Sequence, residues 1–258
     1  MARRRGSARR RRRGSGGFLY KLLSIFLICG CLVAAITLFF RVDTVVITGE
    51  KRYTEAEIRQ ASGVKDGDNL FLLNKYQVIR NIAEALPYIE IENTHIQRKL
   101  PDTLLIQVQE CGDPLAWTQD GTVWLVSPAG KIVEQTDTAA GHPTIDGCEL
   151  LAPSVETQIA VDAAYETRRE SLLELLAVLD ETGELAKVDA IHLGETSYIS
   201  MDYMGRFTVK MPYQADFSYK LRVLELAINS DKIQDNMTGT FDMRQEAGQV
   251  IFDQDTRK

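Results

Sequence analysis

The chain has few of the residues that build metal sites and disulfide frameworks. It holds four cysteines and three histidines in 258 residues, with no C-x-x-C pair and no histidine cluster, which argues against a zinc site. Cys29 and Cys31 fall within an apolar run, where thiols pack as small apolar groups. Cys111 and Cys148 could pair in an oxidising compartment, but their spacing does not require it. The cysteines therefore predict no disulfide framework.

Short catalytic motifs are also absent. Neither a G-x-x-x-x-G-K-[ST] phosphate loop nor a G-x-G-x-x-G turn occurs. His95, His142 and His192 lie in no short motif with serine, cysteine or a carboxylate, and we interpret them as surface or edge residues; a triad formed only in the fold stays open. Residues 66–69 lack the 12-residue ligand series of a calcium loop and fit a turn. We expect a non-enzyme with no catalytic residue, no metal and no cofactor.

Acidic residues are missing from the first 41 positions, which hold ten basic ones. Of the chain's 30 basic side chains, 20 therefore lie in the other 217 residues, against 36 acidic ones, which gives that part a net charge of −16. This asymmetry indicates that the two ends face different surroundings. Nucleic acid binding needs Lys and Arg on the folded surface, so the acidic part argues against it. A composition of 45% hydrophobic and 26% charged residues also excludes a disordered or fibrous chain.

One long apolar run predicts a membrane span over residues 22–40. Its only hydroxyl side chains are Ser24 and Thr37, and nineteen helical residues cover roughly 28 Å, close to the hydrocarbon thickness. The basic cluster precedes the run, so residues 1–21 are expected to form a cytoplasmic tail and the rest to lie outside. A cleaved signal peptide fits less well, because its apolar core would be shorter and would end in small residues. A lipidation site at Gly30-Cys31 also fits poorly, because nine further residues of the run follow it, all but Thr37 apolar.

The first part of the ectodomain predicts a β-α-α-β-β unit. A β-branched run ends at Gly49, and the sequence from Thr54 to Glu57 is a capping box that opens a helix. A second helix begins at Asn74 and ends at Pro87, because proline cannot continue it. The economical packing is a three-stranded sheet with both helices on one face. The predicted strands are residues 42–48, 89–98 and 103–109.

After Pro114 the pattern changes to short strands and hairpin turns, with an irregular crossing over residues 135–153. Trp117 and Trp124 flank one of these turns and are expected in the core, rather than as a platform for sugars. A helix is predicted over residues 165–180, and the buried stripe of a second helix is given by Phe217, Leu221, Leu224 and Ile228. The predicted strands are residues 115–118, 122–126, 131–134, 188–193, 198–201, 206–211, 238–244 and 249–252.

An ordered set of short motifs follows the span at fixed distances. It comprises Val45-x-Ile47-x-Gly49, Glu57-Ile58, Gly67-x-Asn69-Leu70-Phe71, Pro87-Tyr88-Ile89, Arg98-x-Leu100-Pro101-Asp102-Thr103-Leu104, then Trp124, Gly130 and Phe241-Asp242-Met243-Arg244. This set resembles the FtsQ/DivIB cell-division family over nearly all of residues 20–252. Cys111 stands where members commonly carry Arg, so a contact made by that Arg is in doubt here. The long tail of some DivIB proteins has no counterpart.

The resemblance implies an α+β fold in five parts. They are the tail 1–21, the transmembrane helix 22–40, a POTRA domain over 42–110, a mostly antiparallel β domain with helices over 111–252, and a short polar tail 253–258.

In function, the resemblance implies a bitopic scaffold at the division septum. Its expected partners are FtsB/DivIC-type and FtsL-type bitopic proteins, septal wall-synthesis enzymes and the cytoplasmic membrane, with no nucleic acid and no small-molecule substrate. The alternative is a POTRA protein that chaperones or translocates polypeptides. That reading expects several POTRA repeats or a β-barrel, and neither is evident in the sequence.

The resemblance implies a partner-binding site at the C-terminal end of this chain. A final strand is expected at a sheet edge, where free N–H and C=O groups can receive a partner segment. The other reading, that this hairpin only closes the core, stays open. Proline at Ile251 is expected to remove an edge donor and to leave the domain folded. The predicted site residues are Arg244, Gln245, Glu246, Ala247, Gly248, Val250, Ile251 and Phe252.

Overall fold

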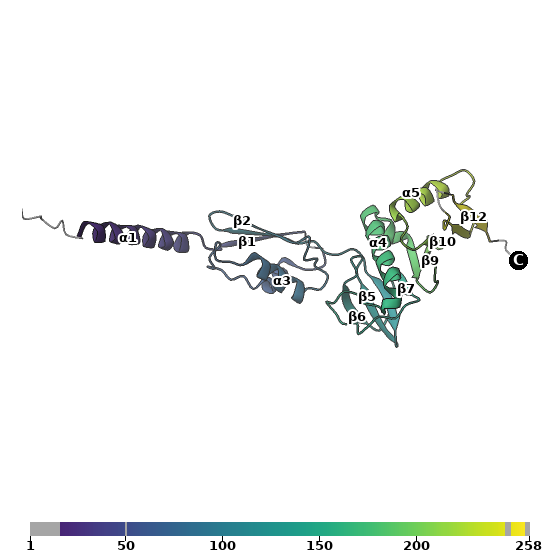
Figure 1. The fold of residues 1–258 in the computed structure, drawn as a ribbon, viewed down its shortest axis with the longest axis horizontal. Coiled ribbons are helices and arrows are strands. Elements are labelled where there is room, and N and C mark those ends of the chain that lie inside the picture. Colours follow the sequence, from purple (N-terminus) through teal and green to yellow (C-terminus); the bar gives the residue numbers. More distant parts are fainter. Residues whose placement is uncertain (1–15, 50, 246–248, 256–258) are drawn as a thin grey trace, which may run out of the picture.

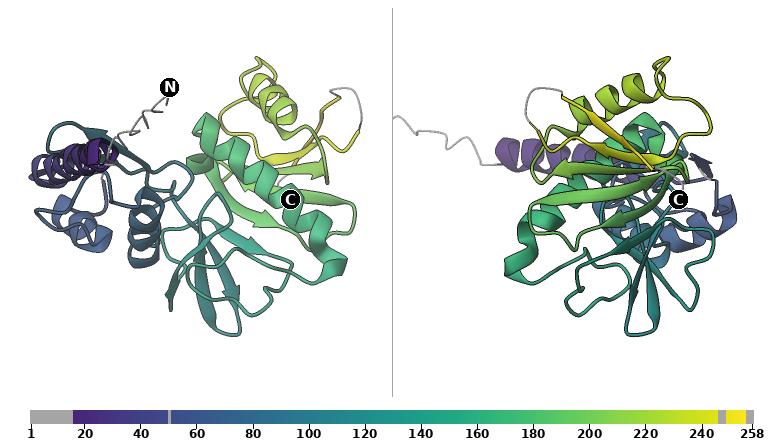
Figure 2. Two further views of the ribbon diagram at one scale, coloured as in Figure 1. Left: turned by 60° about the vertical axis from the view of Figure 1, so that its left-hand side comes forward. Right: turned by 90° about the vertical axis from the view of Figure 1, so that its right-hand side faces the viewer.

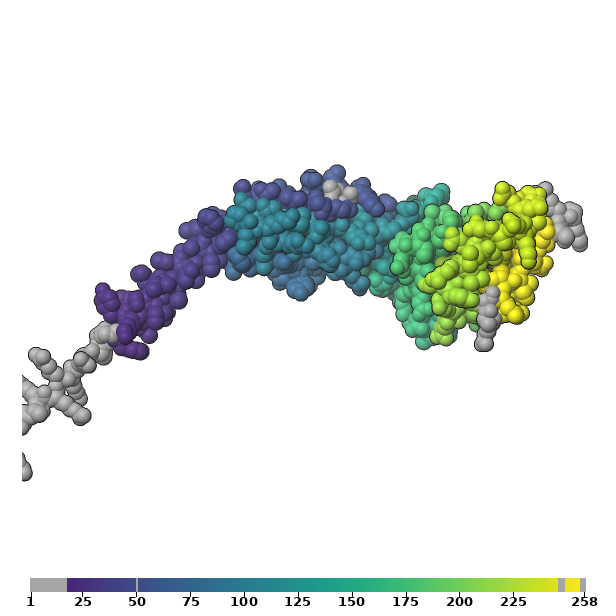
Figure 3. Space-filling view, turned by 90° about the horizontal axis from the view of Figure 1, so that it is seen from above, coloured from purple at the N-terminus to yellow at the C-terminus, as the bar shows by residue number. Residues whose placement is uncertain are grey.

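The computed structural model describes residues 16–49, 51–245 and 249–255. A long helix, a small α+β unit and a larger sheet-based unit follow one another along the molecule (Figure 1), and Figure 3 shows the same succession as a continuous surface. We call residues 42–110 the first unit and residues 111–254 the second unit. The last strand, predicted over residues 249–252, extends from Ile251 to Gln254, so the polar tail predicted over 253–258 was placed two residues too early. The predicted α+β class is confirmed.

Helix α1, Gly16–Phe39, is the one helix of the described residues that is long and apolar enough to cross a membrane. It begins before the predicted span 22–40 and ends one residue earlier. The end is set by the first unit: the Phe40 carbonyl accepts a hydrogen bond from the Leu70 N–H at 3.0 Å, which pulls the chain out of the helix.

The first unit has the predicted β-α-α-β-β order. Its strands pair in the order β1-β3-β2, with β1 parallel and β2 antiparallel to the central strand β3. The predicted capping box at Thr54 and the Asn74 cap both form, so each helix begins where the sequence indicates. The elements are β1 (Thr44–Thr48), α2 (Glu55–Ser62), α3 (Lys75–Ala85), β2 (His95–Lys99) and β3 (Thr103–Gln107).

The strand predicted over residues 89–98 is only half right, because β2 begins at His95. Residues 90–94 close a turn instead, in which the Thr94 hydroxyl donates to the Glu90 carbonyl at 2.6 Å and Asn93 donates to the Glu90 carboxylate at 2.8 Å. Ile89 keeps a single bridge to Glu110. Local side-chain bonds to the backbone therefore outweigh the β-propensity of the isoleucines.

The second unit is one nine-stranded sheet with the order β12-β11-β10-β9-β8-β7-β4-β5-β6. Five of its eight strand pairs are antiparallel, and the pairs β10–β11, β4–β7 and β7–β8 are parallel. The strands are β4 (Leu115–Gln119), β5 (Thr122–Val126), β6 (Ile132–Thr136), β7 (Thr144–Asp146), β8 (Val188–His192), β9 (Tyr198–Tyr203), β10 (Phe207–Pro212), β11 (Gly239–Asp242) and β12 (Ile251–Gln254).

Strand β7 corrects the prediction that residues 135–153 form an irregular crossing. Its three residues lie in the middle of the sheet, parallel to both neighbours. Gly147 follows with φ of +90°, and a Cβ there would meet the Gly194 nitrogen at 2.1 Å, so only glycine allows this close backbone approach.

Two helices cover one face of this sheet (Figure 2). Helix α4, Glu166–Thr182, follows the short helix η1 (Ala163–Tyr165) and precedes η2 (Glu184–Lys187). Helix α5, Phe217–Ile228, connects the parallel strands β10 and β11. The predicted stripe of α5 is buried at Phe217, Leu221 and Leu224, and Trp117 is buried in the same core as predicted.

A small apolar cluster and a side-chain hydrogen bond of Tyr88 join the units. Tyr88 of the first unit packs with Ala116, Val123, Leu125 and Val133 of the second. Its hydroxyl donates to the Glu134 carboxylate of the second unit at 2.6 Å. Within the first unit, the Arg52 guanidinium lies 3.9 Å from the Tyr88 ring centroid. Burial raises the pKa of Tyr88, so this donor stays protonated at neutral pH.

Candidate protein-binding edge

Strand β12 forms one end of the nine-stranded sheet. It pairs with β11 on one side, and no other strand of the described residues pairs with its outer side. The expectation that the final strand lies at a sheet edge is therefore confirmed. An edge strand of this kind presents a row of free backbone donors and acceptors.

Three phenylalanines fix β12 to the core. Phe252 lies directly opposite Phe241, with ring centroids 4.7 Å apart, and Phe207 lies 5.0 Å from Phe241 and 6.1 Å from Phe252. Aromatic pairs at these distances stabilise beyond the area they bury. Val250 also packs against this core. The inner face of the edge strand is thus occupied.

The outer face of β12 carries a free apolar side chain. Ile251 lies opposite Asp242 and is 49% exposed. The same cross-strand row continues through Lys210 of β10 and Ser200 of β9 to His192 of β8. Ile251 is therefore the apolar end of an otherwise polar row.

The hydrogen-bond parity of the hairpin identifies the free backbone groups. Antiparallel pairs alternate between residues that exchange N–H···O bonds and residues that do not. The Asp255 N–H donates to the Thr238 carbonyl at 2.9 Å, so the alternation assigns Ile251 and Asp253 to bonded pairs with β11. The backbone groups of Phe252 and Gln254 then point away from β11, to the open edge.

This parity corrects the proposed use of proline at Ile251. The N–H of Ile251 belongs to the ladder with β11, so proline there would break the hairpin and leave the open edge in place. Gln254, whose side chain is exposed, is the suitable position.

Arg244 has an acidic partner within its own chain. It already pairs with Asp242, through Nη2 to Oδ2 at 2.5 Å and Nε to Oδ1 at 2.9 Å, and its guanidinium lies 4.9 Å from the Tyr198 ring centroid. Hydrogen bonding to Arg244 lowers the pKa of Asp242, which remains ionised at neutral pH. Both groups are partly exposed, so the pair orders the end of β11 more than it stabilises the fold.

Lys220 is a site residue that the sequence reasoning missed. It lies on α5, its residue is only 7% exposed, and its Nζ donates to the Met243 carbonyl at 2.7 Å and the Gln245 carbonyl at 2.8 Å. The signal was its position between Phe217 and Leu221 in the buried stripe of the helix. Its ammonium group thus holds the chain segment that leads from β11 toward β12.

The structure brings most of the predicted site residues to one end of the sheet. Arg244 and Gln245 are exposed, Val250 and Phe252 pack inward, and Ile251 points outward. Glu246, Ala247 and Gly248 lie outside the described residues.

Comparisons with known proteins point to one family. Residues 40–110 match the family described as POTRA domain, FtsQ-type. The chain is 25% identical to the cell division protein FtsQ of Bradyrhizobium diazoefficiens over 205 residues, 80% of this chain and 54% of that protein. It is 27% identical to DivIB of Clostridium acetobutylicum over 171 residues, 63% of this chain and 66% of that protein.

The matched model and the named relatives together support the FtsQ/DivIB family for this chain. A further relative, DivIB of Clostridium botulinum, is 30% identical over 115 residues, 44% of either chain. The chain spans about half the length of the first relatives it matches. These relatives are named as cell division proteins, and helix α1 of this chain is long and apolar enough to cross a membrane.

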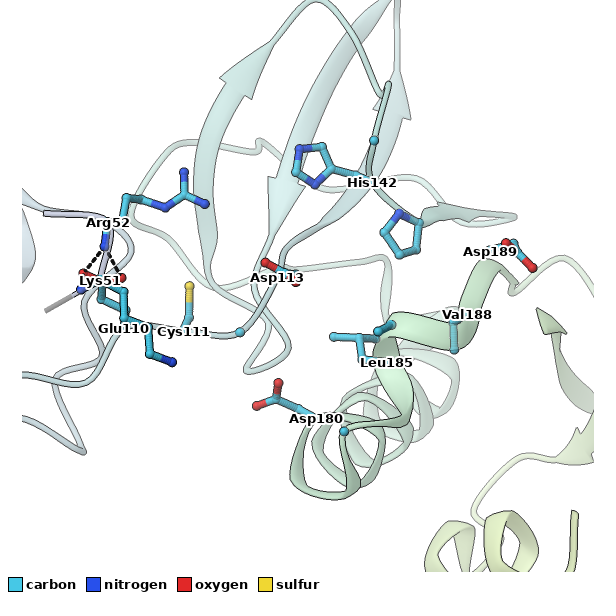
Figure 4. Close-up of a pocket in the computed structure, with 15 residues that line it drawn as sticks. Lys51, Arg52, Glu110, Cys111, Asp113, His142, Asp180, Leu185, Val188 and Asp189 are labelled. Carbon is cyan, nitrogen blue, oxygen red and sulfur yellow. Dashed lines mark hydrogen bonds between the residues drawn. The ribbon is translucent and has the colours of Figure 1, made fainter. Parts of the chain in front are cut away.

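A cleft between the units is a second candidate site (Figure 4). It has a volume of about 1050 Å³, and Cys111, Asp113 and Asp180 are among the residues that line it. Burial raises the pKa of the Cys111 thiol to about 12, so the thiol stays protonated at neutral pH and is a poor nucleophile. Burial and the nearby Asp113 raise the pKa of Asp180. Cys111 and Cys148 are both free thiols.

One histidine makes polar contacts that the sequence did not indicate. His192 Nδ1 lies 2.9 Å from Asp146 Oδ2, and its Nε2 lies 3.3 Å from Asp202 Oδ2. The three side chains come from adjacent strands, so the group bridges β7, β8 and β9. Despite the cost of burial, its two carboxylate partners raise the pKa of His192. In the described part of the chain, no group of three or more His, Cys, Asp and Glu side chains could hold a metal ion.

Proposed function

We propose that this protein is a non-enzymatic scaffold of the division machinery, whose second unit captures a partner protein along β12. The partner adds a strand to the sheet and hydrogen-bonds to the free backbone groups of Phe252 and Gln254. Its side chains on the outer face then pack beside Ile251. The observation that carries this proposal is the open edge of a nine-stranded sheet, fixed to the core from behind by Phe241 and Phe252.

The partner that this edge suits is an extended segment with apolar side chains. Family membership points to FtsB/DivIC-type and FtsL-type bitopic proteins, through which the scaffold would contact the septal wall-synthesis enzymes. The polypeptide chaperone is the weaker candidate, because the described residues contain one POTRA-type sheet, formed by three strands.

The first prediction tests the edge with Gln254→Pro. Proline removes the N–H that faces the open edge and leaves the bonded positions of β12 intact. A lost backbone hydrogen bond, with a partner carbonyl left unpaired, should weaken binding of the FtsB/DivIC-type protein about 10- to 100-fold. Isothermal titration with the purified full-length proteins in detergent measures the change.

Gln254→Ala is the matched control, because it removes the same side chain and keeps the N–H. It should bind as tightly as the parent chain. Ile251→Pro should instead break the β11–β12 ladder and loosen the hairpin, which hydrogen exchange would detect. Unchanged affinity of a folded Gln254→Pro variant would move the partner site away from this edge.

The second prediction concerns orientation, which rests on the basic tail ahead of α1. A reporter that is active only in the cytoplasm should work when fused after residue 15 and fail when fused after Val42. A reporter active only outside should give the opposite pattern. An ectodomain reached only from the cytoplasm would contradict the scaffold proposal as a whole.

A further inference from the structure

An exposed apolar tip lies beside the point where α1 enters the first unit. The turn after Leu70 presents Phe71, which is 45% exposed, and Leu72, which is 80% exposed. Tyr76, in the first turn of α3, is 85% exposed. Large apolar side chains gathered so openly on one short segment mark a surface that something covers.

The tip is tied to the end of the membrane helix by hydrogen bonds. The Asn69 amide donates to the Ile36 carbonyl at 3.1 Å and to the Thr37 carbonyl at 3.4 Å, which are among the last carbonyls of α1. Its side-chain oxygen accepts from the N–H groups of Phe71 at 2.9 Å and Leu72 at 3.1 Å. One asparagine therefore joins the helix end to the tip.

Aromatic contacts place the tip at the depth of the helix end. The Phe71 ring centroid lies 5.0 Å from that of Phe40, which in turn lies 5.5 Å from that of Phe39, the last residue of α1. Leu70 is fully buried in the core of the first unit and holds the turn from the other side. The tip is thus a fixed part of the fold, level with the apolar end of the helix.

A second exposed leucine lies at the same end of the unit. Leu100 forms the turn between β2 and β3 and is 56% exposed. Next to it, the Asp102 carbonyl accepts from the N–H groups of Asp43 at 2.9 Å and Thr44 at 3.3 Å, just after the helix exit. The two exposed turns therefore flank the point at which the chain leaves α1 (Figure 1).

We propose that these turns, carrying Phe71, Leu72 and Leu100, insert into the outer surface of the same bilayer that α1 crosses. The occupant is lipid, because the tip is continuous with the helix end: its backbone and rings contact residues 36–40, which would themselves lie at the boundary of the hydrocarbon. Charges at this end are of both signs, with Arg41 and Lys99 near Asp43, so the contact depends on apolar burial and not on anionic lipid. The first unit would then stand on the membrane in a fixed orientation.

The test uses the full chain reconstituted in phosphatidylcholine vesicles with brominated acyl chains, which quench tryptophan on contact. The native Trp117 and Trp124 lie in the second unit and give a constant background. Leu72→Trp and Leu100→Trp should each lose about half or more of their added emission, because an interfacial group lies roughly 5–10 Å into the headgroup and acyl boundary.

Ile91→Trp is the matched control. Ile91 is a 53% exposed residue at the opposite end of the same unit, where it lines a cleft against the second unit. Its added emission should be unaffected by bromine. Equal emission of Leu72→Trp in brominated and plain vesicles, with α1 shown to be inserted by carbonate extraction, would overturn the proposal. Quenching of Ile91→Trp to the same extent would also overturn it, because the whole unit would then lie flat on the lipid.

Discussion

Ile106→Asp is expected to unfold residues 42–110 and to leave the second unit folded. Ile106 is fully buried in the central strand of the first unit, between β1 and β2. An unpaired carboxylate there costs several kcal/mol, in addition to the apolar contacts that are lost. A unit of this size has a free energy of unfolding of about 4–10 kcal/mol, so one such change removes most of it.

The two units can be observed separately because both tryptophans belong to the second one. Trp117 is buried in its core, and the core of the first unit contains no tryptophan. The tryptophan-monitored melting curve of Ile106→Asp should therefore match that of the parent chain. Limited proteolysis should at the same time cleave within residues 42–110.

Gln107→Asp is the control for this prediction, since it places the same carboxylate one residue further along β3, on an exposed position. It should change stability by less than about 1 kcal/mol. Loss of the tryptophan signal together with the first unit would instead show that the contacts around Tyr88 make one cooperative domain. That outcome would reject separate folding of the two units.

Where a local pattern determined the structure, the sequence was sufficient to predict it. The capping box at Thr54 and the apolar stripe of α5 form as expected, because each depends on residues within two or three turns. Strand β7 was not predictable in this way, because three residues are too few to show an alternating apolar pattern. It forms through pairing with β4 and β8, which lie far away in the sequence.

The location of the candidate site at a sheet edge was predictable from the sequence, but the contacts of its individual residues were not. An edge position follows from β12 being the last strand, but which of its N–H groups face outward depends on the register with β11. The sequence alone did not indicate that Arg244 forms an ion pair with Asp242. Lys220 reads as a solvated lysine, although its place in a buried stripe marks it as an exception.

Lys220→Met is expected to loosen the edge strand and to destabilise the second unit by about 2–4 kcal/mol. Methionine has similar length and fills the same space, so the packing of α5 is kept. The carbonyls of Met243 and Gln245 lose their charged donor, and each was paired at under 3 Å. A buried carbonyl without a partner costs close to the full price of its desolvation. Urea unfolding monitored by tryptophan measures the total effect.

Lys210→Met is the matched control. Lys210 lies on the outer face of β10, its Nζ is 5.7 Å from the Tyr198 ring centroid, and within the described residues it donates no hydrogen bond to a backbone carbonyl. It should change stability by less than about 1 kcal/mol.

Hydrogen exchange then separates a local from a global effect of Lys220→Met. If Lys220 holds the segment that leads to β12, the amides of Ile251 and Asp253, which bond to β11, should exchange faster in Lys220→Met, while those of β9 keep their protection. An equal increase of the amide exchange rates in β9 and β12 would mean that Lys220 stabilises the core as a whole and does not specifically hold β12.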